Sequence, residues 1–329
     1  MGVHLLEASY IRASDGIEIY LCKWLSASEQ VKGVVQLTHG MVEHIGRYDE
    51  FAQFLTTQGF HVIGHDHRGH GRTAMRNGIQ GYLDKRDGFH RLVHDVKDIN
   101  EAIRKKYDLP VYLFGHSMGS FIARRFIQMF PNAVDGTILS GTGGPNWILG
   151  EVGKLIANSA NLLCSPLAPG IFLSKVTFGQ YNKRFDPCKT ELDWLSRDGT
   201  EVEKYLEDPL CGFTCTNKFY QDLCIGLSFI HKKSEVKKVS PNMPIFLISG
   251  ALDPVGNQGK GVFAVAKQLA KAGVKDVEVR LYDEGRHEML KELNRQLVFN
   301  DVLSKLNNWA GRLDKGIKNN ISLFQSRGS

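Results

Sequence analysis

Short apolar runs alternate with helical patterns along most of the chain. Residues 33–38 and 61–64 are apolar runs closed by loops rich in glycine and histidine, and residues 48–55 between them carry apolar side chains at helical spacing. The pattern repeats, predicting strands at 111–114, 134–139, 244–248 and 277–281 and helices at 93–103, 118–130, 262–269 and about 287–309. Apolar strands separated by helices predict an α/β fold with a mostly parallel sheet covered by helices on both faces.

Two stretches depart from this rhythm. Residues 17–24 alternate between apolar and polar side chains, which predicts an antiparallel strand at an exposed edge of the sheet. Residues 144–216 interrupt the alternation with an apolar stretch at 166–173, and residues 190–193 have the sequence of a helix start with a capping box. Long insertions in compact domains usually form lids or binding segments, so we expect a cap here. An ordinary helical excursion without a role in binding is the alternative.

The expected organisation is therefore a core interrupted by a cap. The first part of the core spans 1–143, the cap or lid spans 144–216, the second part of the core spans 217–313, and a polar C-terminal tail spans 314–329. We expect the tail to fray, since terminal polar segments are rarely tied down.

Composition is that of an ordinary folded protein. The 329 residues are 42% hydrophobic and 23% charged, with a net charge of +6 and no long block of one sign. No basic stripe is interleaved with aromatic residues, so we expect no nucleic-acid partner, whereas the basic stretch 231–238 leaves transient contact with a membrane surface open. The N-terminus lacks a secretory pattern, and a cytoplasmic location is expected. No feature of the sequence indicates the oligomeric state.

Residues 115–119, Gly-His-Ser-Met-Gly, fit the Gly-x-Ser-x-Gly pattern of a serine nucleophile. A predicted strand runs into the motif and a helix leaves it, so Ser117 is expected on a tight, strained strand-to-helix turn. Glycines flank the serine because side chains there would collide with neighbouring backbone. The hydroxyl would then lie at the positive end of a helix, where developing negative charge is favoured.

A serine hydroxyl needs a base within hydrogen-bond reach. His287 follows the last predicted strand, at the same sheet edge as the serine. Asp253 follows the strand at 244–248 and is the candidate carboxylate that orients the imidazole. Asp276 precedes a strand and so faces the wrong edge, and Asp283 shares a tight loop with the histidine, where it is better placed as a turn residue. The order serine, aspartate, histidine is that of the α/β-hydrolase fold.

Attack on a carbonyl also requires donors for the developing oxyanion. The backbone N–H of Met118, next after the nucleophile, is one candidate. The second is the backbone N–H of Met41, in the loop after the strand at 33–38, where Gly40 permits close approach. A mere tight turn at this loop is the alternative.

Two sequence features contain possible metal ligands but are better explained without a metal site. The loop 65–71 contains three histidines and an aspartate, but the arginine inside it disfavours a dication, so we predict a structural loop beside the site. The six cysteines are scattered, as reduced packing thiols are, and Cys211 and Cys215 have no histidine nearby in sequence. We therefore expect no metal and no cofactor.

Taken together, these motifs resemble the monoacylglycerol lipase and lysophospholipase branch of the α/β-hydrolases. The resemblance spans about residues 10–310 and is carried, in order, by 39–44 with Arg47-Tyr48, 66–71, 115–119 and the loops of Asp253 and His287. It implies an α/β-hydrolase fold with an inserted helical cap, a carboxylic ester hydrolase that needs no cofactor, a catalytic triad of Ser117, Asp253 and His287, and oxyanion donors at Met41 and Met118. Val42 and Ser120 stand where this family usually has glycine.

The leading hypothesis is a serine hydrolase that cleaves monoacyl esters of lipids, such as monoacylglycerols or lysophospholipids, through an acyl-enzyme. A small-ester or aryl esterase and an aminopeptidase with the same triad are the alternatives. A peptidase would need an acidic site for the substrate amine, for which the cap offers Glu191, Asp193, Glu201 and Glu203. A hydrolase-like binding protein without turnover is a fourth hypothesis, which an intact triad disfavours. The expected partner is a small-molecule or lipid ester.

Overall fold

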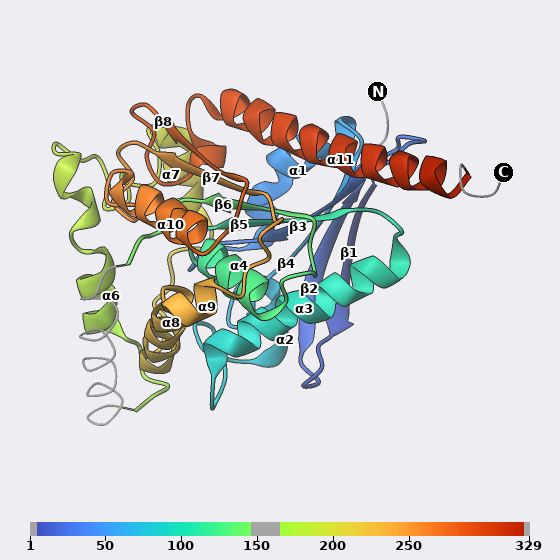
Figure 1. Cartoon of the computed structure of the whole chain (residues 1–329). Helices are drawn as coiled ribbons and strands as arrows, with labels where there is room; N and C mark the ends of the chain where they lie inside the picture. Colours follow the sequence, from blue (N-terminus) through green and yellow to red (C-terminus); the bar gives the residue numbers. More distant parts are fainter. Residues whose placement is uncertain (1–4, 146–164, 326–329) are drawn as a thin grey trace.

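The computed structural model describes residues 5–145 and 165–325 and is built around one eight-stranded sheet (Figure 1). The strands are β1 (Leu5–Arg12), β2 (Glu18–Leu25), β3 (Gly33–Thr38), β4 (Phe60–His65), β5 (Val111–His116), β6 (Gly136–Ser140), β7 (Ile245–Gly250) and β8 (Val277–Tyr282). Their order in the sheet is β1-β2-β4-β3-β5-β6-β7-β8. The pairs β1–β2 and β2–β4 are antiparallel and the others parallel, which confirms the predicted, mostly parallel sheet.

Helices cover both faces of the sheet (Figure 1). They are η1 (Ile45–Tyr48), α1 (Asp49–Thr57), α2 (Gly71–Asn77), α3 (Gly88–Lys106), α4 (Met118–Met129), α6 (Ile171–Phe178), η3 (Tyr181–Arg184), α7 (Gly199–Glu207), α8 (Asn217–Ile230), α9 (Lys233–Val236), α10 (Lys260–Lys271), η4 (Met289–Lys291) and α11 (Arg295–Gln325). The apolar faces of α3, α4 and α10 pack into one core layer and those of α1 and α11 into the other, on the opposite side of the sheet. This arrangement is the α/β-hydrolase fold.

The ends of the chain differ from the prediction. The strand predicted at 17–24 is present as β2, but it is not an edge strand, because β1 pairs along its outer side from Leu5↔Leu25 to Arg12↔Glu18. The last helix begins at Arg295 rather than near His287 and continues to Gln325, through most of the predicted tail. No proline interrupts residues 295–325, so polar composition alone does not end the helix.

Between β6 and α8 lies the segment expected to form a cap. Residues 146–164 of it, with Cys164, lie outside the described residues. The described part contains α6, which lies at the left edge of Figure 1, followed by η3 and α7.

The helix predicted to start at Thr190 is wrong. Its capping contacts form, with the Thr190 N–H donating to Asp193 Oδ1 at 3.0 Å, but residues 190–195 make turns. In place of helical donors, the carbonyls of Trp194 and Leu195 accept from the N–H groups of His287 and Glu288, so this stretch follows the His287 loop. The next helix, α7, starts only at Gly199, where the Asp198 side chain caps it by accepting from Thr200 N–H.

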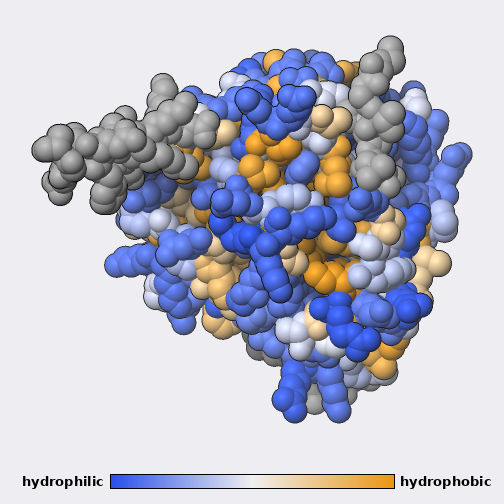
Figure 2. Space-filling model, turned by 90° about the vertical axis from the view of Figure 1, so that its right-hand side faces the viewer, coloured by the Kyte–Doolittle hydropathy of each residue, from blue (hydrophilic) through white to orange (hydrophobic). Residues whose placement is uncertain are grey.

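On the face shown in Figure 2, hydrophilic and hydrophobic residues are interspersed, and the hydrophobic ones form separate groups. Within 5–145 and 165–325, every helix is too short or too polar to span a lipid bilayer.

Candidate active site

Ser117 occupies the predicted turn between β5 and α4. Its φ of 52° and ψ of −118° place a non-glycine residue in a strained region of backbone space. The flanking glycines are required by contact: a Cβ at Gly115 would lie 2.4 Å from the carbonyl oxygen of Gly119, and a Cβ at Gly119 would lie 2.1 Å from that of Thr38. The half-buried hydroxyl therefore stands at the N-terminus of α4, as the motif predicted.

The structure brings Ser117, His287 and Asp253 together from three separate loops. Imidazole Nε2 of His287 lies 2.9 Å from Ser117 Oγ, and Nδ1 lies 3.0 Å from Asp253 Oδ1. The carboxylate is held in turn by the N–H of Val255 at 2.9 Å and by the hydroxyl of Ser249 at 3.1 Å. With Nδ1–H donated to Asp253, Nε2 is the free acceptor that faces the serine hydroxyl.

The rival carboxylates lie elsewhere. Asp276 pairs with Arg312, and its backbone carbonyl accepts from Ile245 at the start of β7, so it lies at the opposite edge of the sheet. Asp283 is exposed in the turn after β8.

Burial and charge act in opposite directions on the histidine and the aspartate. Burial alone would lower the pKa of His287, but the Asp253 carboxylate beside it raises that pKa above the ordinary value of 6.5. Burial alone would raise the pKa of Asp253, but His287 and the hydrogen bonds from Val255 and Ser249 hold it below its ordinary value. Asp253 thus stays ionised, and the imidazole is a stronger base than a free histidine.

His116 packs against the His287 imidazole, with ring centroids 4.8 Å apart, and is kept neutral. Burial lowers its pKa to about 4, and the neighbouring His287 adds to the effect.

The loop after β3 lies directly against the serine, where the second oxyanion donor was predicted. A Cβ at Gly40 would lie 2.7 Å from Glu43 Oε1 and 3.3 Å from Ser117 Cβ, so a side chain here would displace the Glu43 carboxylate and crowd the serine. His39 Nδ1 lies 2.7 Å from the Gly40 carbonyl, and His39 Nε2 accepts from the His67 N–H, which fixes Nδ1 as the donor. Because the Gly40 carbonyl shares its peptide plane with the Met41 N–H, this contact sets the direction of that N–H.

A buried charge network lies behind this loop, and no motif assigned it a role. Glu43 accepts from the Gly40 N–H at 2.5 Å and from the Tyr48 hydroxyl at 2.8 Å. Arg47 bridges Glu43 at 2.6 Å to both oxygens of Glu288 at 2.6 and 2.7 Å. The network joins the oxyanion loop to the residue that follows His287. Its one sequence signal is the i, i+4 spacing of Glu43 and Arg47. It lines a cavity of about 20 Å³, room for a single water molecule.

The histidine-rich loop 65–71 is used structurally. The Asp66 carboxylate accepts from the N–H groups of Ile45 at 2.8 Å and Arg72 at 2.7 Å. Arg68 makes a paired contact with Asp95 at 2.6 and 2.7 Å. The loop therefore supports the turn after β3, a structural role of the kind that the sequence predicted beside the site.

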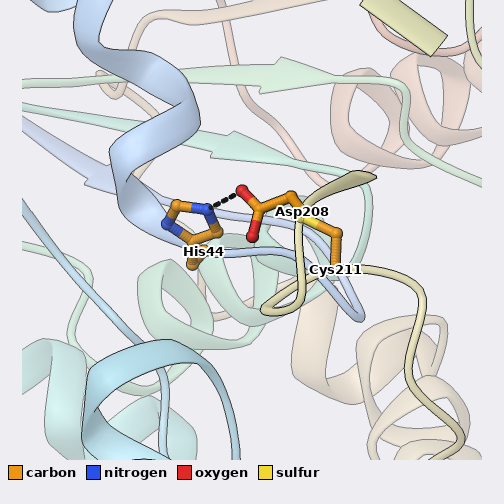
Figure 3. Close-up of side chains that lie close together, drawn as sticks. All are labelled: His44, Asp208 and Cys211. Atoms are coloured by element: carbon orange, nitrogen blue, oxygen red, sulfur yellow. Dashed lines mark hydrogen bonds and ion pairs between the residues drawn. The ribbon is translucent and has the colours of Figure 1, made fainter. Parts of the chain in front are cut away.

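Three possible metal ligands gather beside the same turn: His44, Asp208 and Cys211, whose ligand atoms lie within 4.8 Å of one another (Figure 3). His44 Nδ1 accepts from the Gly46 N–H at 3.2 Å, so Nε2 carries the proton and donates to Asp208 Oδ2 at 2.8 Å. A metal at Nε2 would move the ring proton to Nδ1, against that N–H. These contacts favour a hydrogen-bonded pair over a metal site, although sequence spacing had not brought His44 near Cys211.

The segment after α6 packs against the histidine. The Trp194 ring lies 5.0 Å from the His287 ring, centroid to centroid, and Tyr181 packs edge-on against Trp194 at 4.9 Å. These aromatic side chains belong to the expected cap, and no sequence pattern had singled them out. They shield the imidazole from water, which strengthens its pairing with Asp253.

The family assignment rests on the whole core. A family profile described as "Serine aminopeptidase, S33" matches residues 29–294. The chain belongs to this family. It is a hydrolase with the α/β-hydrolase fold, and the matched range contains the serine, the aspartate and the histidine described above.

Curated relatives and solved structures agree with this assignment. The chain is 29% identical to the monoglyceride lipase of Homo sapiens over 308 residues, covering 91% of this chain and 88% of the relative. It is 27% identical to the monoacylglycerol lipase of Mycolicibacterium smegmatis, covering 88% and 92%. A thermostable carboxyl esterase from Bacillus coagulans superimposes with a TM-score of 0.87 at 26% identity, covering 94% of this chain and all of that one.

Proposed function

We propose that the protein is a serine carboxylic ester hydrolase that acts through an acyl-enzyme on Ser117. The observation that carries the proposal is the position of one imidazole, which spans from Asp253 Oδ1 at 3.0 Å to Ser117 Oγ at 2.9 Å. His287 Nε2 takes the hydroxyl proton as Oγ attacks the ester carbonyl, and Asp253 stabilises the resulting imidazolium. The N–H groups of Met41 and Met118 donate to the oxyanion.

Collapse of the tetrahedral intermediate expels the alcohol, which takes the proton from His287. The acyl group is then bound to Ser117 Oγ. A water molecule, deprotonated by the same imidazole, attacks this ester, and the carboxylic acid leaves with the serine regenerated. Each half-reaction uses the same base and the same oxyanion donors.

The substrates we propose are monoacyl esters of lipids, such as monoacylglycerols or lysophospholipids. Support comes from the relatives named as monoglyceride lipases and from the surface of α6. Ile171, Phe172 and Val176 on this helix are 58%, 65% and 48% exposed, and such apolar side chains suit transient contact with a lipid surface.

An aminopeptidase is the weaker alternative, although the family carries that description. It would need a free carboxylate for the substrate amine. Of the cap carboxylates considered, Glu191 and Glu203 are exposed. Asp193 accepts from Thr190, and Glu201 pairs with Lys204 at 2.6 Å and Lys291 at 3.3 Å. These contacts disfavour an amine site built from Asp193 or Glu201.

Hydrolysis of a long-chain monoacylglycerol, a long-chain lysophospholipid, a short-chain aryl ester and an aminoacyl anilide would separate these activities. We expect the highest kcat/KM on a long-chain monoacyl ester, and a loss of about 10⁴-fold or more in Ser117→Ala and His287→Ala. Highest kcat/KM on the anilide would favour the peptidase, and near wild-type turnover in His287→Ala would contradict the mechanism.

A further inference from the structure

Val42, next to the predicted oxyanion donor Met41, has a strained backbone. Its φ is 54°, a conformation that a β-branched residue adopts only under constraint. Glycine would adopt it without strain. Something in the structure must therefore hold Val42 in place.

The constraint comes from the last turn of α7 and from the segment that follows this helix. The Tyr205 hydroxyl donates to the Val42 carbonyl at 2.8 Å, and the Gly212 N–H donates to the same oxygen at 2.9 Å. Tyr205 is only 6% exposed, and the Arg47 guanidinium stacks on its ring, 4.7 Å from the centroid. The Tyr205 hydroxyl is thus held in place.

A third contact holds the same two segments together. His44, two residues after Val42, donates to Asp208, which lies between Tyr205 and Gly212 in the chain; Figure 3 shows the loop of Asp208 and Cys211 lying against His44. The turn 42–44 is therefore fastened to residues 205–212 at two points.

From these contacts we infer that Tyr205 is a positioning residue for the oxyanion hole: its hydroxyl holds Val42 at positive φ and thereby keeps the Met41 N–H aimed at the carbonyl oxygen under attack. This inference rests on the proposed function. Without the hydroxyl, the Val42 carbonyl keeps only the Gly212 N–H as a donor, and Val42 relaxes toward negative φ. This rotation about the N–Cα bond of Val42 displaces Met41. The Met41 N–H belongs to the preceding peptide, whose Gly40 carbonyl is held by His39, so displacement of Met41 strains that contact and moves the N–H off its line to the oxyanion. The transition state then loses part of a donor interaction that the bound substrate does not need.

A double-mutant cycle between Tyr205→Phe and Val42→Gly tests this coupling. We expect Tyr205→Phe to lower kcat about tenfold with KM changed less than about twofold, since loss of a whole oxyanion donor costs about 10² to 10³. In the Val42→Gly background the same substitution should lower kcat less than about threefold, because glycine keeps positive φ without the hydroxyl. A loss of equal size in both backgrounds, or unchanged kcat in Tyr205→Phe, would overturn the inference.

Two controls separate positioning from folding. Tyr282 is also buried, and its hydroxyl donates to Asp301 at 2.8 Å rather than to the turn 42–44, so Tyr282→Phe should leave kcat within about twofold of wild type. Folded active sites are counted by the end-point of fluorophosphonate labelling. If Tyr205→Phe does not fold, Asp208→Asn replaces it in the double-mutant cycle. We then expect a smaller loss of kcat, which is again reduced in the Val42→Gly background. Additive losses of kcat would overturn the inference.

Activity of Ser117→Ala tests the proposed function independently of the role of Tyr205. Should Ser117→Ala retain turnover, the serine mechanism fails whatever Tyr205 does. An inactive Ser117→Ala together with wild-type kcat in Tyr205→Phe removes only the positioning role.

Discussion

Arg47 and Glu288 form a two-point ion pair, with N–O distances of 2.6 and 2.7 Å, although they are 241 residues apart in the chain. The pair joins the turn after β3 to the loop of His287, so it links the two segments that the proposed chemistry requires. Glu43 completes it on the other side of the guanidinium. Breaking it leaves buried carboxylates without a counter-charge.

Arg47→Met should therefore lower the free energy of unfolding by about 3 to 5 kcal/mol, as expected when one partner of a buried ion pair is removed. Urea denaturation measures this. Lys97→Met is the matched control, because its partner Glu101 is exposed and such pairs contribute about 0 to 1 kcal/mol. Equal losses in the two variants would contradict the account.

Stability should also fall in acid through Glu288. Burial would raise the pKa of this carboxyl, but Arg47 lowers it from 4.5 to about 2. Because the pKa of Glu288 is lower in the folded chain than in the unfolded chain, its ionised carboxylate stabilises the fold. This contribution is complete above about pH 4.5 and is lost as the pH falls from about 4.5 toward about 2. Urea midpoints across this range should show a shallower pH dependence in Glu288→Gln than in wild type; parallel curves would argue against the assignment.

The pH dependence of catalysis should report a pKa of His287 above its ordinary value, although burial alone would lower that pKa. Only the neutral imidazole accepts the serine proton, so kcat/KM should rise with pH through the pKa of His287, which Asp253 raises above 6.5. The measurement is a pH profile of kcat/KM from about pH 5 to about pH 9. In Asp253→Asn the inflection should move to lower pH and kcat should fall about 10⁴-fold. An inflection below 6.5 in the wild type would contradict the geometry.

Gly119 and Gly311 both lie in helices, but replacing each by alanine should change the stability of the protein in opposite directions. In Gly119→Ala the new Cβ meets the carbonyl oxygens of Thr38 at 2.1 Å and His39 at 2.6 Å, both backbone atoms. We expect a loss of about 3 kcal/mol or more. A Cβ at Gly311 meets nothing within 4 Å, so Gly311→Ala should gain about 0.5 to 1 kcal/mol from helix propensity. Thermal denaturation of both variants measures the difference, and similar shifts would contradict the packing described.

Sequence patterns predicted the sheet, the strand-to-helix turn at Ser117 and the loops of Asp253 and His287, because each has a local signature of apolar runs, glycines or chain order. No local signature predicts contacts between segments that are distant in the chain. Such contacts include the Arg47–Glu288 pair, the Tyr205 contact with Val42 and the packing of Trp194 against His287. The turn at Thr190 was mistaken for a helix start because its capping contacts are local, whereas the carbonyl acceptors that end it serve His287 and Glu288. The cytoplasmic location and the cap limits at 144–216 stay predictions.

The most direct test of the central claim is covalent labelling by a fluorophosphonate followed by peptide mapping. Wild type should carry the phosphonyl group on Ser117, Ser117→Ala should remain unlabelled, and Ser120→Ala, which changes the serine one turn further along α4, should still label at Ser117. Labelling that persists in Ser117→Ala, or maps to another residue in the wild type, would contradict the account.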